Sequence, residues 1–133
     1  MPISFEGFCV GCAYDRPALA EIWGYKSWAA IAKGVVTPAG QPVIVLFITK
    51  EKQGTLPQYQ DTFDGEVLRM EGEDGHGSDE RLINADRNGD EVHLFYRDRH
   101  HAPFIYEGRV VLEEYQRLTG KPSRFVFRRW THR

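Results

Sequence analysis

The residues whose types most clearly suggest a chemical function lie between positions 93 and 110. Two apolar, aromatic-rich segments there flank a turn that carries Arg97, Arg99, His100 and His101. Cationic groups on a hairpin between aromatic side chains suit a polyanion whose bases can stack, which describes nucleic acid. This stretch therefore indicates binding of nucleic acid more clearly than hydrolytic chemistry.

Tyr59 and Asp61 form a second candidate pair, because residues two apart share one face of an extended segment. The tyrosine ring can stack on a base while the carboxylate accepts from an exocyclic amine on the base's Watson–Crick edge. From the residues alone, the alternative is that Tyr59 packs at the rim of the core and Asp61 caps a turn.

Carboxylates between positions 61 and 79 also suggest divalent-metal chemistry. Asp61, Glu71 and Glu73 faintly match a metal-dependent nuclease with carboxylates on neighbouring strands, although the usual nearby lysine is missing. The ligand spacing of a calcium loop is absent, as are a nucleophile elbow, a phosphate-binding loop and an HNH ligand set. We expect no catalytic residue, no bound metal and no cofactor, and we keep a small metal-dependent nuclease as the alternative.

Cys9 and Cys12 form a lone Cys-x-x-Cys motif. Zinc needs two more thiolate or imidazole ligands, and a thioredoxin-type pair belongs to a βαβ unit, for which no pattern follows. We expect a structural or incidental role, with zinc and redox chemistry as alternatives. A disulfide is not expected in a cytoplasmic chain.

Length and composition place these groups on one globular domain. The chain has 133 residues, of which 41% are hydrophobic, so it predicts a single domain over residues 1–133. No stretch approaches the ~20 apolar residues that span a bilayer, and the N-terminus lacks the basic flank and apolar run of a signal peptide. We therefore expect a cytoplasmic protein with no membrane partner.

Charge is distributed unevenly along the chain. The overall formal charge is −2, but residues 51–90 hold four Lys and Arg against eleven Asp and Glu, while residues 91–133 hold nine against five. Because a ligand responds to the local field, this asymmetry indicates one positive face. The alternative is that the charged residues merely solvate strand edges and loops.

The elements that must position these residues are two short helices followed by strands. Helices are predicted over residues 15–24 and 27–34; they faintly match a helix–turn–helix, but the apolar body of the second indicates packing. Strands are predicted over residues 42–49, 66–71, 91–96, 104–112 and 123–130, with a loop over 72–79 and a short segment over 81–85. The economical architecture is an α+β fold, a curved, partly closed β-barrel with two short N-terminal helices.

Seven segments occur here in a familiar order: residues 14–25, 32–38, 45–52, 59–61, 68–73, 92–97 and 104–108. In their combination and spacing, the chain resembles a domain found fused to restriction-type helicases and to HNH endonucleases, a relative of the SRA and PUA-like modules. The resemblance covers residues 14–128. It implies an SRA/PUA-like fold and a role as the specificity module of a modification-dependent restriction system.

SRA-like modules hold duplex DNA against a crescent-shaped barrel and rotate a modified base out into a pocket. That family often has Trp where this chain has Met70. The base pocket that the resemblance implies comprises Tyr59, Asp61, Met70, Glu71 and Tyr96. The candidate contacts to the DNA backbone are Arg16, Lys33, Arg97 and Arg99, together with His100 and His101 of the turn.

The sequence thus predicts a module that binds double-stranded DNA carrying 5-methylcytosine or a related mark, by base flipping and without catalysis of its own. A nuclease or helicase domain is the expected partner in a longer protein. A small metal-dependent nuclease and a PUA-like RNA-binding module remain the alternatives, since one fold serves several functions.

Overall fold

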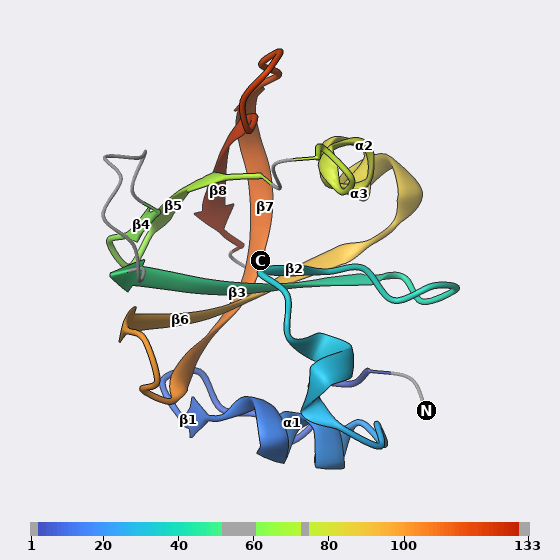
Figure 1. Cartoon of the computed structure of the whole chain (residues 1–133), viewed down its shortest axis with the longest axis vertical. Helices are drawn as coiled ribbons and strands as arrows, with labels where there is room; N and C mark the ends of the chain where they lie inside the picture. Colours follow the sequence, from blue (N-terminus) through green and yellow to red (C-terminus); the bar gives the residue numbers. More distant parts are fainter. Residues whose placement is uncertain (1–2, 52–60, 73–74, 131–133) are drawn as a thin grey trace.

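One eight-stranded sheet organises the chain (Figure 1). The structure, a computed structural model, describes residues 3–51, 61–72 and 75–130. The strands are β1 (Ala13–Tyr14), β2 (Val35–Val36), β3 (Val43–Glu51), β4 (Thr62–Phe63), β5 (Val67–Glu71), β6 (Glu91–Arg99), β7 (Phe104–Gln116) and β8 (Arg124–Arg129). The helices are α1 (Arg16–Ile22), the 3-10 helix η1 (Trp28–Ile31), α2 (Asp79–Ile83) and α3 (Ala85–Asn88).

The strand order is β2-β3-β6-β7-β8-β5-β4, and β1 pairs with β7 off this path. Only β3 and β6 run parallel among these pairs of described strands; the other neighbours are antiparallel. The crossover from β5 to β6 carries α2 and α3, and β6, β7 and β8 lie between β3 and β5 in the sheet order.

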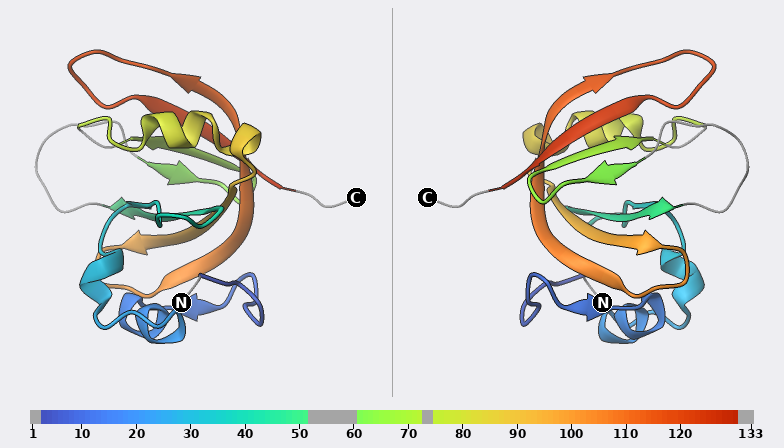
Figure 2. Two further views of the ribbon diagram at one scale, coloured as in Figure 1. Left: turned by 90° about the vertical axis from the view of Figure 1, so that its right-hand side faces the viewer. Right: turned by 90° about the vertical axis from the view of Figure 1, so that its left-hand side faces the viewer.

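The sheet is strongly curved along β7 (Figure 2). The first part of β7 pairs with β6 and the second part with β8, and the two pairings meet at Val110. Gly108 has a φ of 90°, and register shifts interrupt both ladders, which increases local twist. The predicted α+β architecture with a curved sheet is confirmed, and the sheet stays open instead of closing into a barrel.

Hydrophobic side chains fill both faces of β3. Ile44, Leu46 and Ile48 belong to one cluster with β5, β6 and β8, while Val45 and Phe47 belong to a second cluster under α1. Successive side chains of a strand point to opposite faces, so a continuous apolar run suits a strand covered on both sides. The strand predicted over residues 42–49 is confirmed as β3, and it is buried on both faces.

The first predicted N-terminal helix is present as α1. Its N-cap is Asp15, whose side chain accepts from the N–H of Ala18 at 2.8 Å, and Pro17 lies in the first turn. The second helix is shorter than predicted: η1 covers only four residues after Ser27, because the chain beyond Ile31 turns into β2. Ile31 is buried, but Trp28 is 51% exposed, so the expectation of packing holds for only part of the segment.

The region before β6 is helical, which the sequence does not predict. The short segment predicted over residues 81–85 belongs to two short helices, α2 and α3. Leu82 and Ala85 are buried in the core, and Gly89 ends α3 in the left-handed conformation with a φ of 78°. Five and four residues are too few to show helical periodicity, which explains the error.

Cys9 and Cys12 form a disulfide, contrary to expectation. Their Cα atoms lie 5.5 Å apart, because the chain turns between them with Gly11 at a φ of 93°. Gly11 N–H donates to the carbonyl of Tyr106 at 2.8 Å, and this bond attaches the turn to β7. The disulfide therefore closes a turn near the N-terminus that is bonded to β7.

No helix in the described part of the chain is long and apolar enough to cross a membrane.

Candidate nucleic-acid interface

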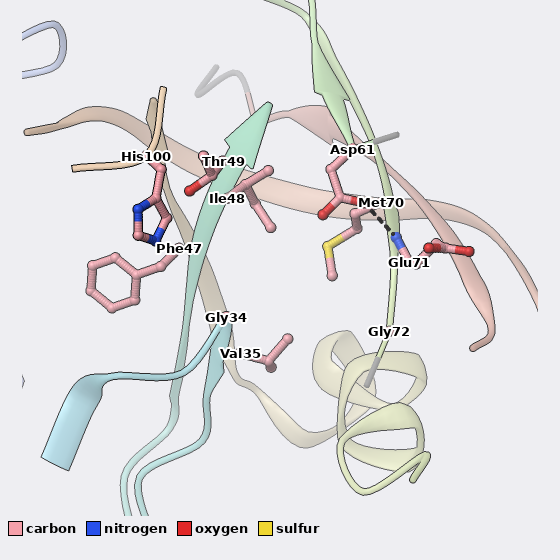
Figure 3. A pocket seen from close by; sticks show the side chains of 10 residues that line it. All are labelled: Gly34, Val35, Phe47, Ile48, Thr49, Asp61, Met70, Glu71, Gly72 and His100. Atoms are coloured by element: carbon pink, nitrogen blue, oxygen red, sulfur yellow. Dashed lines mark hydrogen bonds between the residues drawn. The ribbon is translucent and has the colours of Figure 1, made fainter. Parts of the chain in front are cut away.

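A pocket of about 360 Å³ lies between β3 and β5, near the end of β3 (Figure 3). That volume falls in the range of small-molecule sites. Its lining residues are Gly34, Val35, Phe47, Ile48, Thr49, Asp61, Met70, Glu71, Gly72 and His100. The pocket thus combines β2 and β3, the strand pair β4–β5 and the turn after β6.

Asp61 supplies the acidic wall of this pocket. It is only 3% exposed, and its Oδ1 accepts the backbone N–H of Glu71 at 3.0 Å. In Figure 3 the carboxylate of Asp61 points toward the pocket, whereas the side chain of Glu71 points away from it. Glu71 therefore contributes its backbone, which fixes the orientation of the carboxylate that a ligand meets.

The wall facing Asp61 is apolar and is formed by Val35 and Ile48. Met70 lies beside Asp61, is 1% exposed, and in Figure 3 lies on the side of the pocket opposite Ile48 and Val35. These three side chains belong to one buried cluster. A ligand held here meets the Asp61 carboxylate and the Met70 thioether on one side and the hydrocarbon of Val35 and Ile48 on the other, which suits a flat heterocycle with neighbouring polar and apolar edges.

Gly72 follows β5 at a point where no side chain fits. A Cβ there would lie 2.8 Å from Oδ1 of Asp79 and 2.9 Å from the ring of Phe125. The N–H of Gly72 donates to the carbonyl of Ser123 at 2.8 Å. The close approach of α2 and β8 thus fixes the path of the chain just beyond Met70 and Glu71.

Two residues predicted for the base pocket lie elsewhere or cannot be placed. Tyr96 is 8% exposed and packs edge-on against Phe63 with ring centroids 5.6 Å apart; it is not among the lining residues. Burial raises the pKa of the Tyr96 hydroxyl, and the Asp61 carboxylate contributes to the rise. Tyr59 lies outside the described residues.

Cationic side chains lie around the mouth of the pocket at the β6–β7 turn. His100 is exposed and lines the pocket, and its ring lies 4.1 Å from that of His101, which has a φ of 71°. The pKa of His100 is lowered by desolvation and then by the neighbouring charges of His101, Arg97 and Arg16. Arg99 is exposed at the end of β6. Arg99 and the neighbouring Arg97 give the turn its positive charge, and His100 adds to it where the ring is protonated.

Arg16 and Arg97 are more deeply placed than the sequence indicates. Arg16 donates to the carbonyls of Ile31 and Lys33, and Arg97 donates to the Thr49 hydroxyl and the Ala102 carbonyl. Burial lowers the pKa of both guanidinium groups. The side chain of Lys33 lies exposed between η1 and Gly34. Arg16 of α1 and Arg97 of β6 therefore come together beside the β6–β7 turn.

Several lining residues escaped the sequence analysis. Ile48 and Thr49 belong to an apolar strand that reads only as core, and Gly34, Val35 and Gly72 carry no chemical signal. Their common location depends on the curvature that brings β3 and β5 together, which no local pattern reports. Of the alternative metal set Asp61, Glu71 and Glu73, the last residue lies outside the described residues. Over the described ranges, no group of three or more metal-ligating side chains is found.

Comparisons with solved structures identify the fold. The chain superimposes on the SRA domain of SUVH5 in complex with hemi-methylated CG DNA with a TM-score of 0.67 and 20% identity, covering 99% of this chain and 95% of that chain. The SUVH5 SRA complex with fully methylated CG DNA matches with a TM-score of 0.65 and 19% identity. The complex with methylated CHH DNA matches with a TM-score of 0.64 and 17% identity, and both have the same coverage as the first. The chain therefore has the SRA fold, as the sequence resemblance predicted. No protein-family model matches the sequence, and no curated protein matches it.

Proposed function

We propose that this chain binds double-stranded DNA carrying a modified base, 5-methylcytosine or a related mark, and holds that base in the pocket between β3 and β5. One observation carries the proposal: on an SRA fold, a pocket with a buried carboxylate opens beside a cluster of cationic side chains. The SRA domains that share the fold are in complex with methylated DNA.

The polar and apolar groups of the pocket match the two relevant edges of a 5-substituted cytosine. The exocyclic amine of cytosine and its C5 substituent are neighbours on the ring. Asp61 can accept from the amine, while Met70 and Ile48 offer an apolar surface to a methyl group. Burying one methyl group stabilises by about 0.8 kcal/mol, which corresponds to about fourfold in affinity. That factor is the smallest preference for the mark that the pocket should give.

Rotating a base out of the duplex costs a few kcal/mol. A hydrogen bond to a buried charged group contributes about 1.5–3 kcal/mol, so the contact with Asp61 offsets most of this cost. Cationic contacts to phosphate add affinity that does not depend on sequence and weakens with salt. His100, His101, Arg99 and Lys33 are the exposed groups suited to that role, and Arg16 and Arg97 lie just behind them.

In this proposal the chain recognises DNA and does not cut it. The sequence resemblance supports a place as the specificity module of a modification-dependent restriction system, in which a nuclease or helicase domain is the partner that acts on the bound DNA. Such a module works in the cytoplasm, where it meets the DNA.

A binding screen at one fixed salt concentration tests the proposal. The probes are otherwise identical duplexes that contain cytosine, 5-methylcytosine, 5-hydroxymethylcytosine, N4-methylcytosine or N6-methyladenine, and a structured RNA competitor. We expect tightest binding to a duplex with a C5-modified cytosine. Equal binding to all duplexes, or better binding to the RNA, would contradict the proposal.

A further inference from the structure

Arg16 holds one rim of the pocket through two backbone carbonyls. Its Nε donates to the Ile31 carbonyl at 3.0 Å, and a terminal nitrogen donates to the Lys33 carbonyl at 3.2 Å. The chain runs directly from these residues into Gly34 and Val35, which line the pocket. The position of that wall therefore depends on the fork of one guanidinium group.

Arg97 holds the neighbouring part of the same wall, at the end of β3, in the same manner. Its Nε donates to Oγ1 of Thr49 at 2.8 Å, and a terminal nitrogen donates to the Ala102 carbonyl at 3.1 Å. Thr49 lines the pocket, and Ala102 closes the turn that carries the lining residue His100. Arg97 thus joins the end of β3 to the β6–β7 turn.

One buried ring connects the two arginines. The guanidinium carbons of Arg16 and Arg97 lie 4.9 and 4.1 Å from the ring centroid of Phe104, which is 1% exposed. Arg16 also lies 4.7 Å from the centroid of Phe47, another lining residue. A planar guanidinium can stack on a ring and donate in its plane at once, which a lysine ammonium cannot do.

On the basis of the proposed function, we propose that Arg16 and Arg97 are positioning residues for base recognition, which fix the shape of the pocket wall made by β2, the end of β3 and the β6–β7 turn, and do not merely add charge at the DNA surface. A plain phosphate contact adds equal affinity for every duplex. A positioning residue changes the preference for the modified base and leaves the charge-dependent part of binding in place.

Charge-conserving variants separate the two roles. Arg16→Lys and Arg97→Lys keep the positive charge but lose the fork and the stacking. Affinities for a modified duplex and its unmodified counterpart are measured over a range of salt concentrations, with thermal unfolding of each variant. We expect the ratio of the two affinities to fall from the wild-type value of at least about fourfold toward one, with the salt slope unchanged. Arg87→Lys, at an exposed position on α3, is the matched control and should retain the wild-type ratio.

A second pair of variants covers the case in which the lysine variants fail to fold. Thr49→Val removes the acceptor of Arg97, and Thr49→Ser keeps it; we expect the first to lower the ratio and the second to retain it. If Arg97 acts through its hydrogen bond to Thr49, the affinity ratio of the double variant Arg97→Lys/Thr49→Val falls no further than that of Arg97→Lys alone.

The outcomes distinguish this inference from the proposed function. A wild-type ratio of one would refute the proposed function, and the inference with it. A wild-type ratio above one that survives in both lysine variants would refute the inference alone. The inference would also be contradicted if the Arg97→Lys and Thr49→Val substitutions lowered the affinity ratio additively in the double variant.

Discussion

The backbone N–H of Glu71 donates a hydrogen bond of 3.0 Å to Oδ1 of Asp61 and so ties the residue before β4 to the last residue of β5. This bond orients a carboxylate that is 3% exposed toward the pocket. It also separates the roles of two neighbouring acids, because Asp61 presents its side chain to a ligand and Glu71 presents its backbone.

Asp61→Asn should weaken binding to the modified duplex about 10- to 100-fold, because the amide keeps an oxygen for the Glu71 N–H but loses the charged acceptor for the base amine. The slope of affinity against salt should not change, since no phosphate contact is removed. Fluorescence anisotropy titrations over several salt concentrations measure both quantities. Asp86→Asn, at an exposed position on α3, is the control; a wild-type affinity for Asp61→Asn would exclude the carboxylate from recognition.

Filling the pocket at Gly34 should abolish the preference for the modified base without unfolding the protein. A Cβ at Gly34 meets only the Phe47 carbonyl oxygen, at 3.6 Å, so Gly34→Ala fits in ordinary contact. Gly34→Leu extends further into the space that the base would occupy. We expect Gly34→Ala to keep the preference and Gly34→Leu to lose it, with both variants binding unmodified duplex as the wild type does. Retained preference in Gly34→Leu would place the reading site elsewhere.

Binding should strengthen as the pH falls, because of His100. Desolvation, His101, Arg97 and Arg16 lower the pKa of His100 below its ordinary value of 6.5, so the free protein carries it mostly neutral at neutral pH. A DNA phosphate favours the charged ring and raises its pKa, so binding takes up a proton in the window around and below about pH 6.5. Anisotropy titrations across that window measure the effect, and His100→Gln should flatten it. A pH-independent wild-type affinity would contradict a phosphate contact by this residue.

The free energy of unfolding should decrease as the pH falls, because of His93. Its ring stacks on Phe5 with centroids 3.7 Å apart, its Nδ1 lies 2.7 Å from the Tyr106 hydroxyl, and its Nε2 lies 3.0 Å from Glu91. Burial lowers the pKa of His93 in the folded state, although the Glu91 carboxylate opposes the shift. A folded-state pKa below the unfolded one means that stability is complete above about pH 6.5 and is lost as the pH falls toward the lowered value.

Urea unfolding at about pH 8 and about pH 5.5 measures this loss, and His93→Gln should reduce the difference between the two values. A wild-type free energy of unfolding that is the same at both pH values would show that His93 does not control acid sensitivity. The DNA-binding titrations above are therefore restricted to pH values at which the unfolding data show a folded protein.

The sequence predicts the core strands better than it predicts the pocket. The apolar run of β3 and the caps of α1 are local signals, and the structure agrees with both. The short helices α2 and α3 and the disulfide between Cys9 and Cys12 were missed, because two short helices carry little periodicity and a lone Cys-x-x-Cys permits several chemistries.

The pocket depends on long-range geometry. Asp61 and Met70 were candidates through family resemblance, yet their partners across the pocket, Val35 and Ile48, read as ordinary core residues. Arg16 and Arg97 were candidates for phosphate contacts because they are cationic. Their bonds to Lys33 and Thr49 follow from the curvature of the sheet, which no spacing in the sequence reports.

The most direct test of the central claim is a paired titration of the wild-type chain with one duplex, with and without a single 5-methylcytosine, at the same salt concentration. The account predicts tighter binding to the methylated duplex by at least about fourfold, the contribution of one buried methyl group, and a steep loss of both affinities as salt rises. Equal affinities for the two duplexes across the salt range would contradict it.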